Sequence, residues 1–317
     1  LAPAAVEELL ARVTEAGWRA RFAAIDPVPL ASASIGQVHR ARLTGGEEVV
    51  VKLIKGAPRD AFLADVASLR RLIRFILLFY PKLRRVADPL GTLEAIRENT
   101  VAELDLRDER AGQDLLRGLR DQYATPLNLA GLRFPHIYTE LSGRDVMVTE
   151  YLSGPTFDEL LERRALPYEA LLDLFRIHGA YLFCIGTFHG DIHPGNIVLQ
   201  DGHVTFVDTG AIGRVGDRMR RGLFNFFEHL VVYDYDGCAR ALHGMSDREL
   251  PAAAWNQFAA AFAALYRDFR GRTVSEVSLT RHMMLTIRLA VDHGMVFEKG
   301  MYPIIKSLMY LDGMVLR

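Results

Sequence analysis

The chain has 317 residues, of which 50% are hydrophobic and 24% are charged, proportions that are ordinary for a globular protein with a large core. Its formal net charge of −1 gives no global signal for nucleic-acid binding. Two cysteines are too few for a disulfide framework, so we expect buried free thiols in a reducing compartment, the cytoplasm.

The N-terminal part of the chain predicts a helix followed by a β-hairpin. Apolar residues recur at helical spacing over residues 4–22, and DPVPL at residues 26–30 ends that helix. The runs VHRARL and EEVVVKLIK flank a turn at Gly45-Gly46. Two β-rich runs around a double glycine are typical of a hairpin.

Helices then alternate with further β segments. RDVMVTEYL, residues 144–152, predicts a strand that ends before the break at Gly154-Pro155. NIVLQDGHVTFVD, residues 196–208, predicts a second hairpin that turns at Asp201-Gly202. Helical periodicity covers four further segments: 58–80, 89–118, 156–188 and 216–317.

This order predicts an α+β fold with two lobes. Residues 1–152 are expected to form a small β-rich N-lobe with inserted helices, and residues 153–317 a larger, mostly helical C-lobe. The joint is predicted near residues 152–156. Because a crevice between two lobes is a usual place for a ligand, we expect the ligand site there.

The apolar runs of the chain are short. FILLFYP, residues 75–81, is too short to span a bilayer, and the first residues carry no signal-peptide pattern, so we expect no membrane-crossing segment. The segment Leu69–Arg85 mixes a strongly apolar centre with six basic residues: Arg70, Arg71, Arg74, Lys82, Arg84 and Arg85. It is either an amphipathic helix with a solvated basic rim or a surface for anionic lipid.

The stretch FHGDIHPGNIVLQDGHVTFVDTG, residues 188–210, contains three His, three Asp and one Asn. His189, Asp191 and His193 alternate, which is a possible metal pattern. The break at Pro194-Gly195 and the lack of thiolates disfavour a zinc site, which takes Cys or His at closed spacing.

A phosphoryl-transfer site explains the same stretch better. Asp191 and Asn196 lie five positions apart, which is the spacing of the protein-kinase catalytic loop. Asp208 then follows the predicted strand VTFV, where kinases place a metal-binding aspartate. Oxygen ligands of this kind suit Mg²⁺. His189 is expected to shape the loop by hydrogen-bonding the backbone near Asp208.

A kinase-like site also needs a strand lysine that is held by a helical glutamate. VVVKLIK places Lys52 after three β-branched residues, with Lys55 as the weaker choice. The helical segment that follows holds three acids that could pair with it: Glu98, Glu103 and Glu109.

The strand VMVTEYLSG, starting at residue 146, fits the hinge that meets adenine in such a site. Thr149 would border the pocket, and the Glu150 carbonyl and Leu152 N–H would face the base. The loop before the first hairpin departs from the kinase pattern, because Ala31-Ser32-Ala33-Ser34 has no glycine and is stiffer than a glycine-rich loop. The preference between ATP and ADP therefore stays open.

These residues together resemble the UbiB family of atypical kinases, also called the aarF-domain or ADCK family. ASASIGQVHRARL is similar to its alanine-rich loop, and Glu103-Leu104-Asp105 to its E-x-D helix motif. FHGDIHPGN and DTG are similar to its catalytic and metal motifs, and KSLMYLDGMVLR to the helix where its core ends. The resemblance spans roughly residues 20–317, without the family's N-terminal K-x-G-Q helix and C-terminal transmembrane helices.

The resemblance implies a protein-kinase-like fold that binds ATP or ADP with Mg²⁺ and supports ubiquinone or other isoprenoid-lipid metabolism. It implies an ATPase or small-molecule kinase rather than a protein kinase, peripheral to or anchored on a membrane in the full-length protein, with a lipid or polyprenyl phenol as a possible partner. Lys52 would orient the α- and β-phosphates, Asn196 and Asp208 would hold Mg²⁺, and Asp191 would act as a base or orient water.

The nucleotide-binding residues implied by the resemblance come from the loop, the hairpin, the acidic helix and the hinge: Ala31, Ser32, Ala33, Ser34, Val38, Lys52, Glu103, Glu109, Thr149, Glu150 and Leu152. In the family the E-x-D acids are tied to the K-x-G-Q motif. This favours Glu109 over Glu103 as the partner of Lys52.

Two alternatives remain. Aminoglycoside- or choline-type small-molecule phosphotransferases share an H-G-D-x-H-x-x-N loop, although the Ala/Ser loop and the ENTVAELD helix disfavour them. The other alternative is a non-catalytic nucleotide-binding scaffold of a lipid-biosynthetic complex.

Overall fold

A computed structural model describes residues 17–32, 36–54, 58–79, 89–272, 278–298 and 300–317. The chain folds into two compact units. The first contains the residues before Asp114 together with Pro135–Leu152, and the second contains Asp114–Phe134 and Ser153–Arg317.

The division between the units differs from a simple cut of the sequence. It passes through the predicted joint, after Leu152, but it also assigns residues 114–134 to the second unit. The reason is packing, because Leu116, Leu129 and Leu132 are fully buried in the core of that unit. The division into functional lobes 1–152 and 153–317 stays a prediction.

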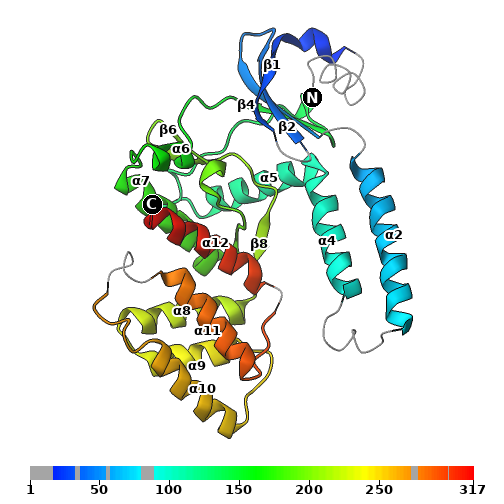
Figure 1. The fold of residues 1–317 in the computed structure, drawn as a ribbon. Helices are drawn as coiled ribbons and strands as arrows, with labels where there is room; N and C mark the ends of the chain where they lie inside the picture. The colour runs from blue at the N-terminus through cyan, green and yellow to red at the C-terminus, as the bar shows by residue number, and fades with distance from the viewer. Residues whose placement is uncertain (1–16, 33–35, 55–57, 80–88, 273–277, 299) are drawn as a thin grey trace. The chain divides into compact units, whose positions relative to one another are not determined.

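The first unit contains a four-stranded antiparallel sheet in the order β1-β2-β3-β4 (Figure 1). Its strands are β1 Phe22–Ser32, β2 Gly36–Leu43, β3 Glu48–Ile54 and β4 Val146–Glu150. Alternate residues of β3 (Val49, Val51 and Leu53) are fully buried on one face. The predicted hairpin and the predicted strand at 144–152 are therefore confirmed, with β4 shorter at both ends.

The segment before the hairpin was predicted wrongly. Residues 18–21 form a single 3-10 turn, η1 Trp18–Arg21, and β1 then runs through DPVPL. A strand tolerates Pro27 and Pro29 here because β1 is at the edge of the sheet and its pairing with β2 shifts register on either side of Pro29. The rest of the predicted helix at 4–22 lies mostly outside the described residues.

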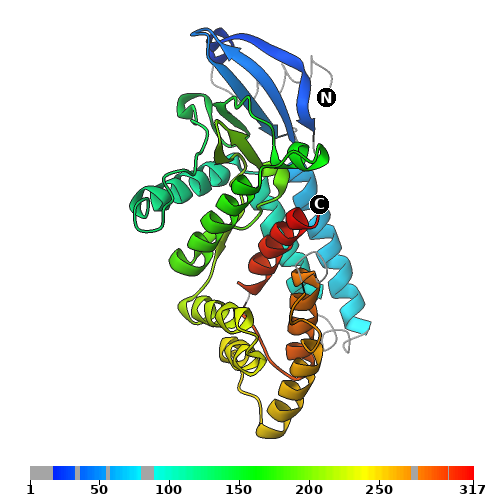
Figure 2. The ribbon, with the colours of Figure 1, turned by 90° about the vertical axis from the view of Figure 1, so that its left-hand side faces the viewer.

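Among the described residues of the N-terminal half there are also three helices and a short turn, η2 Thr139–Leu141. The helices are α2 Pro58–Phe79, α4 Pro89–Glu103 and α5 Leu106–Gln122. α2 and α4 lie side by side (Figures 1 and 2). The helix predicted at 89–118 is broken after Glu103, because the Asp105 carboxylate accepts a hydrogen bond from the Arg107 N–H at 3.1 Å and caps α5. No helix of the described ranges is long and apolar enough to cross a membrane.

The second unit is mainly helical (Figure 2). Its helices are α6 Phe157–Glu162, α7 Tyr168–Gly179, the π-helical segment η3 Ala180–Ile185, the 3-10 turn η4 Pro194–Asn196, α8 Asp217–Val231, α9 Tyr235–Met245, α10 Ala252–Leu265, α11 Leu279–Asp292 and α12 Met301–Val315. Two short strand pairs accompany them: β5 Thr187–His189 with β8 Ile212–Arg214, and β6 Ile197–Gln200 with β7 His203–Phe206. The predicted hairpin is confirmed, and it turns at Asp201 (φ 52°) and Gly202 (φ 76°).

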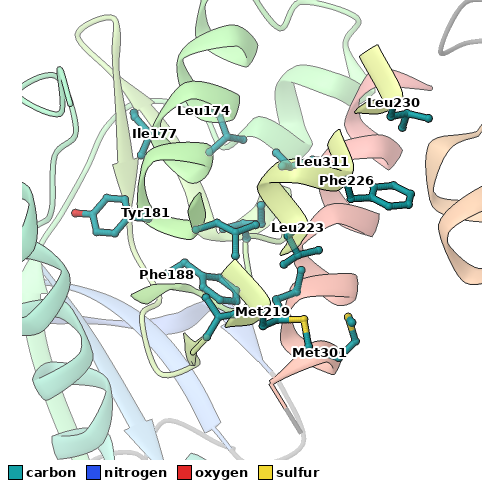
Figure 3. Packing of buried hydrophobic residues seen from close by; sticks show 14 of the residues in the cluster. Leu174, Ile177, Tyr181, Phe188, Met219, Leu223, Phe226, Leu230, Met301 and Leu311 are labelled. Atoms are coloured by element: carbon teal, nitrogen blue, oxygen red, sulfur yellow. The ribbon is translucent and has the colours of Figure 1, made fainter. Parts of the chain in front are cut away.

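One apolar core joins the helices of the second unit to its strands. Figure 3 shows side chains from α7, β5, α8 and α12 meeting there, among them Leu174, Phe188, Leu223 and Leu311. Phe188 is fully buried, and it directly precedes the polar stretch that begins at His189. The core therefore anchors the start of the candidate catalytic loop.

The two cysteines occupy different environments. Cys238 in α9 is buried, and burial raises the pKa of its thiol to about 12. Cys184 in η3 is exposed, because η3 turns Tyr181 and Leu182 into the core instead. The prediction of two buried thiols is therefore wrong for Cys184.

A buried polar contact links α7 to α12. The imidazole Nε2 of His178 lies 3.0 Å from the Ser307 Oγ, and both side chains are buried. Burial lowers the pKa of His178 from its ordinary 6.5 to about 3. The folded protein therefore keeps this ring neutral at pH values where the unfolded chain binds a proton.

This difference predicts an acid-dependent loss of stability. Because the pKa of His178 is lower in the folded state, its effect on stability begins as the pH falls below 6.5 and grows toward 3. Between pH 7.5 and 5 it should cost about 2 kcal/mol of unfolding free energy. Urea denaturation of wild type and His178→Gln at both pH values measures the effect. Equal pH dependence of the two proteins would contradict it.

Candidate functional site

In the first unit, Lys52 lies in the middle of β3, where it pairs with Val38 of β2 and Met147 of β4. Its Nζ is 2.6 Å from the Glu109 Oε2. The Glu109 side chain is only 9% exposed and that of Lys52 is 27% exposed, so this ion pair is largely shielded from water. The structure thus pairs Lys52 with Glu109. The Glu103 side chain lies outside the described residues.

Glu109 is held in place by the start of α5. Arg107 makes a bidentate contact with Asp105, from Nε to Oδ1 at 2.9 Å and from Nη2 to Oδ2 at 2.6 Å. The hydrogen bond from Arg107 lowers the pKa of Asp105. One turn after Glu109, the buried Gln113 donates to the Pro135 carbonyl at 2.8 Å. These contacts fix the helix on both sides of the glutamate.

The sheet separates the predicted nucleotide-binding residues by face. Residues directly opposite in an antiparallel pair share a face, as do residues two apart in one strand. By this register Ala31, Val38, Lys52 and Thr149 share the face opposite to the buried Val51. Ser32 lies on the other face, and its hydroxyl accepts a hydrogen bond from Gln37 at 3.4 Å. Ala33 and Ser34 lie outside the described residues.

The predicted hinge segment begins at the end of β4, the last strand of the sheet. Thr149 is 9% exposed and forms a bridge with Ile137. The Glu150 N–H donates to the His136 carbonyl at 2.8 Å, and its exposed carboxylate accepts from the His136 N–H at 3.1 Å. Leu152, two residues further, is half-buried. Adenine recognition by this segment remains a prediction.

In the second unit, the loop after β5 is held by its own hydrogen bonds. The Asp191 N–H donates to the His189 Nδ1 at 3.1 Å, and the Asn196 Nδ2 donates to the Asp191 carbonyl at 3.1 Å. The His193 Nδ1 accepts from the Gly195 N–H at 3.0 Å. At Gly190 a Cβ would lie 3.3 Å from the Ala211 carbonyl oxygen, so the chain needs glycine there to pass β8 closely.

The two histidines of the loop have structural partners. His189 is buried with its ring edge-on to Phe206 at 5.0 Å between centroids. Burial lowers the pKa of His189, against the opposing effects of the Asp208 and Asp191 carboxylates and a hydrogen bond with the Asp208 backbone. The His193 ring packs edge-on against Tyr310 at 5.3 Å. Both rings therefore shape the loop, as expected for His189.

Asn196 and Asp208 are brought together by the β6–β7 hairpin. The Asn196 carbonyl accepts from the Val207 N–H at 3.1 Å, which places Asp208 in the next position along the chain. The Asp208 Oδ1 accepts from the Gly210 N–H at 3.2 Å, and the Asn196 Nδ2 is directed to Asp191. The amide oxygen of Asn196 and the carboxylate of Asp208 are hard oxygen ligands, so the pair fits a divalent ion such as Mg²⁺.

Lys306 of α12 is a further residue at this site that was not predicted from the sequence. Its Nζ lies 3.0 Å from the Asp191 Oδ1 and 5.7 Å from the centroid of the Tyr310 ring. Burial lowers the pKa of Lys306, but the hydrogen bond to Asp191 and nearby charges outweigh it, so the pKa is raised. In the sequence, KSLMYLDG indicated only the end of the family core. The available signal for a site residue was the spacing of Lys306 and Tyr310, which are four residues apart.

Comparisons with known proteins show which family the chain is similar to. The model of the ABC1 atypical kinase-like domain matches residues 2–242. An uncharacterized chloroplastic aarF domain-containing protein kinase of Arabidopsis thaliana is 26% identical over 316 residues, covering 91% of this chain and 58% of the relative. The probable protein kinase UbiB of Vibrio vulnificus is 28% identical over 324 residues, covering 99% of this chain and 57% of the relative.

Both relatives are longer, so the chain spans a little over half the length of each. Among solved structures, the complex of Rv3197 with erythromycin from Mycobacterium tuberculosis matches the whole chain and 79% of its own, with a TM-score of 0.66 and 22% identity. This likeness shows the fold alone and confirms the predicted kinase-like α+β class. With a family model that covers most of its length, the chain belongs to the ABC1 atypical kinase-like family, the family of UbiB and aarF-domain kinases.

Proposed function

We propose that this protein is a UbiB-type atypical kinase or ATPase that binds an adenine nucleotide together with Mg²⁺. The observation that carries the proposal is the ion pair of Lys52 and Glu109 at 2.6 Å, on the sheet face that also bears Val38 and Thr149. A shielded strand lysine held by a helical glutamate is the arrangement that orients the α- and β-phosphates in kinase-like proteins.

In the second unit, the loop at residues 189–196 and Asp208 would act on the phosphate end of the nucleotide. Asn196 and Asp208 would hold Mg²⁺, which when bound offsets the negative charge of the phosphates. The Asp191 carboxylate, 32% exposed, would accept the proton of the attacking hydroxyl or water. Ala31, in the Ala/Ser loop, would lie near the phosphates, and the hinge residues Thr149, Glu150 and Leu152 would border and contact the base. These roles follow from residue chemistry and the family pattern.

The substrate is proposed from the family. One relative carries the name UbiB, and on that basis we propose that this chain supports ubiquinone or other isoprenoid-lipid metabolism. The exposed apolar surface of α2 is compatible with work at a membrane surface. Its large exposed side chains are Leu69, Leu72, Phe75, Ile76, Leu78 and Phe79.

The metal assignment predicts a loss of nucleotide-induced stabilisation. Asp208→Asn removes a carboxylate charge from the proposed Mg²⁺ site, so the rise in Tm caused by Mg-ATP should disappear. Asp201→Asn is the matched control, because Asp201 lies at the exposed tip of the same hairpin with φ 52°, a conformation that Asn tolerates. A full Mg-ATP shift in Asp208→Asn would refute the metal site.

The ion pair predicts coupled effects on stability and binding. Lys52→Met leaves the nearly buried Glu109 carboxylate without this partner and should cost about 1–3 kcal/mol by urea denaturation. It should also weaken Mg-ATP binding at least about 10-fold in calorimetry. The double variant Lys52→Met/Glu109→Gln should recover part of the stability, because residue 109 then carries no charge. It should not recover the ATP affinity, because the contact of the lysine with phosphate is still missing.

An exposed ion pair on the same sheet is the control for that experiment. Arg40 and Glu48 lie 2.6 Å apart with side chains 42% and 41% exposed. Solvent screens such a pair, so Glu48→Gln should change stability by less than about 0.5 kcal/mol and leave ATP affinity unchanged. Similar losses in both pairs would show that Lys52 is an ordinary structural cation.

The α2 surface predicts binding to anionic vesicles. Arg70, Arg71 and Arg74 are exposed between the apolar side chains of this helix. Arg70→Glu/Arg71→Glu/Arg74→Glu should reduce co-sedimentation with phosphatidylglycerol vesicles roughly 10-fold or more, at about 1 kcal/mol per basic residue. The same change at Arg267, Arg270 and Arg272, exposed residues of the second unit, is the charge-matched control. Unchanged co-sedimentation of the α2 variant would remove the membrane role.

A further inference from the structure

The candidate catalytic loop receives its cation from another part of the chain. Residues 189–196, HGDIHPGN, contain no lysine or arginine. Lys306 of α12 supplies an ammonium group 3.0 Å from the Asp191 Oδ1. The side chains of Lys306 and Asp191 are 35% and 32% exposed, so both are partly accessible to solvent.

α12 holds Lys306 in position through the residues on its buried side. Ser307, the next residue, is fully buried and contacts both the His178 ring at 3.0 Å and the Ile304 carbonyl at 2.9 Å. Further along, the nearly buried Asp312 accepts from the Ser278 hydroxyl at 2.9 Å. The helix cannot turn Lys306 away from the loop without breaking these contacts.

The ammonium carries more N–H donors than its contact with Asp191 uses. A lysine ammonium has three N–H donors, and its ion pair with the Asp191 Oδ1, at 3.0 Å, occupies at most one of them. On the helix, Tyr310 presents its ring 5.7 Å from the Nζ, and the His193 ring packs against the same tyrosine. A phosphate oxygen that enters beside Asp191 would meet a positive charge already fixed in place.

We propose that Lys306 binds the terminal phosphate of a nucleoside triphosphate, selects ATP over ADP, and stabilises the phosphoryl group during its transfer. This inference rests on the proposed function, since Asp191 lies beside the transferred group only if it receives the proton of the attacking oxygen. A compact ammonium suits a phosphate oxygen, and a diphosphate lacks the terminal phosphate that this ammonium would bind.

The transfer step balances without a further reactant. The bond between the γ-phosphorus and the bridging oxygen of ADP breaks, and a bond to the oxygen of water or of an acceptor hydroxyl forms. The proton of that oxygen passes to Asp191, and ADP leaves with the bonding electron pair. Lys306 stays protonated throughout and bridges Asp191 and the phosphoryl oxygens, where it offsets the charge that spreads over them.

The test compares triphosphate and diphosphate binding in the same protein. We expect Lys306→Met to weaken Mg-ATP binding about 10-fold in calorimetry while Mg-ADP binding changes less than about 2-fold. ATP turnover should fall about 100-fold, and Lys306→Arg should retain part of both ATP affinity and turnover. Arg288→Met, which removes an arginine with an 80% exposed side chain from α11, is the charge-matched control and should change neither nucleotide affinity.

Two outcomes overturn the inference in different ways. If Lys306→Met binds ATP and ADP with the wild-type ratio of affinities, Lys306 is only a structural partner of Asp191, and the proposed function stands without it. If the wild type binds neither nucleotide in the presence of Mg²⁺, the proposed function and the role of Lys306 fall together. Lys306→Gln, a shorter neutral side chain, replaces Lys306→Met in all measurements if the latter lacks a wild-type Tm.

Discussion

A carboxylate that is nearly removed from water determines much of the arrangement in the first unit. Glu109 is 9% exposed, and burying such a charge is costly unless a cation lies against it. Lys52 supplies that cation from the middle of β3, so the pair ties α5 to the sheet. The Asp105 cap and the contact of Gln113 with Pro135 then fix the helix register that makes the 2.6 Å contact possible.

In the second unit the requirement is the opposite. The loop after β5 and the segment after β7 carry the carboxylates of Asp191 and Asp208, and these must stay outside the apolar core. The ring nitrogens of His189 and His193 accept hydrogen bonds from backbone N–H groups of the turn. The hairpin places Asn196 beside the strand that leads to Asp208. The ammonium of Lys306 arrives from α12 and lies against Asp191. The buried His189 ring therefore shapes the loop, and the Asp191 and Asp208 carboxylates are half-buried.

Local pattern was a good guide where a short segment decides its own structure. The glycine turn between β2 and β3, the Asp201-Gly202 turn and the strand at 146–150 form because backbone preference and alternation act over a few residues. Local pattern was a poor guide where contacts with other strands determine the structure. Pro27 and Pro29 read as a break, yet β1 passes through them because an edge strand has one unpaired side.

By itself the sequence determined the family, the kinase-like fold and the identity of the acidic and amide groups at the loop, because these depend on residue type and on spacing within one segment. Only the tertiary structure placed Glu109, which the family resemblance favoured, against Lys52, turned Ser32 to the other face of the sheet and brought Lys306 to Asp191. The two ion pairs join side chains far apart in the chain, and the face of Ser32 is set by the pairing of β1 with β2, so all three depend on how helices and strands pack.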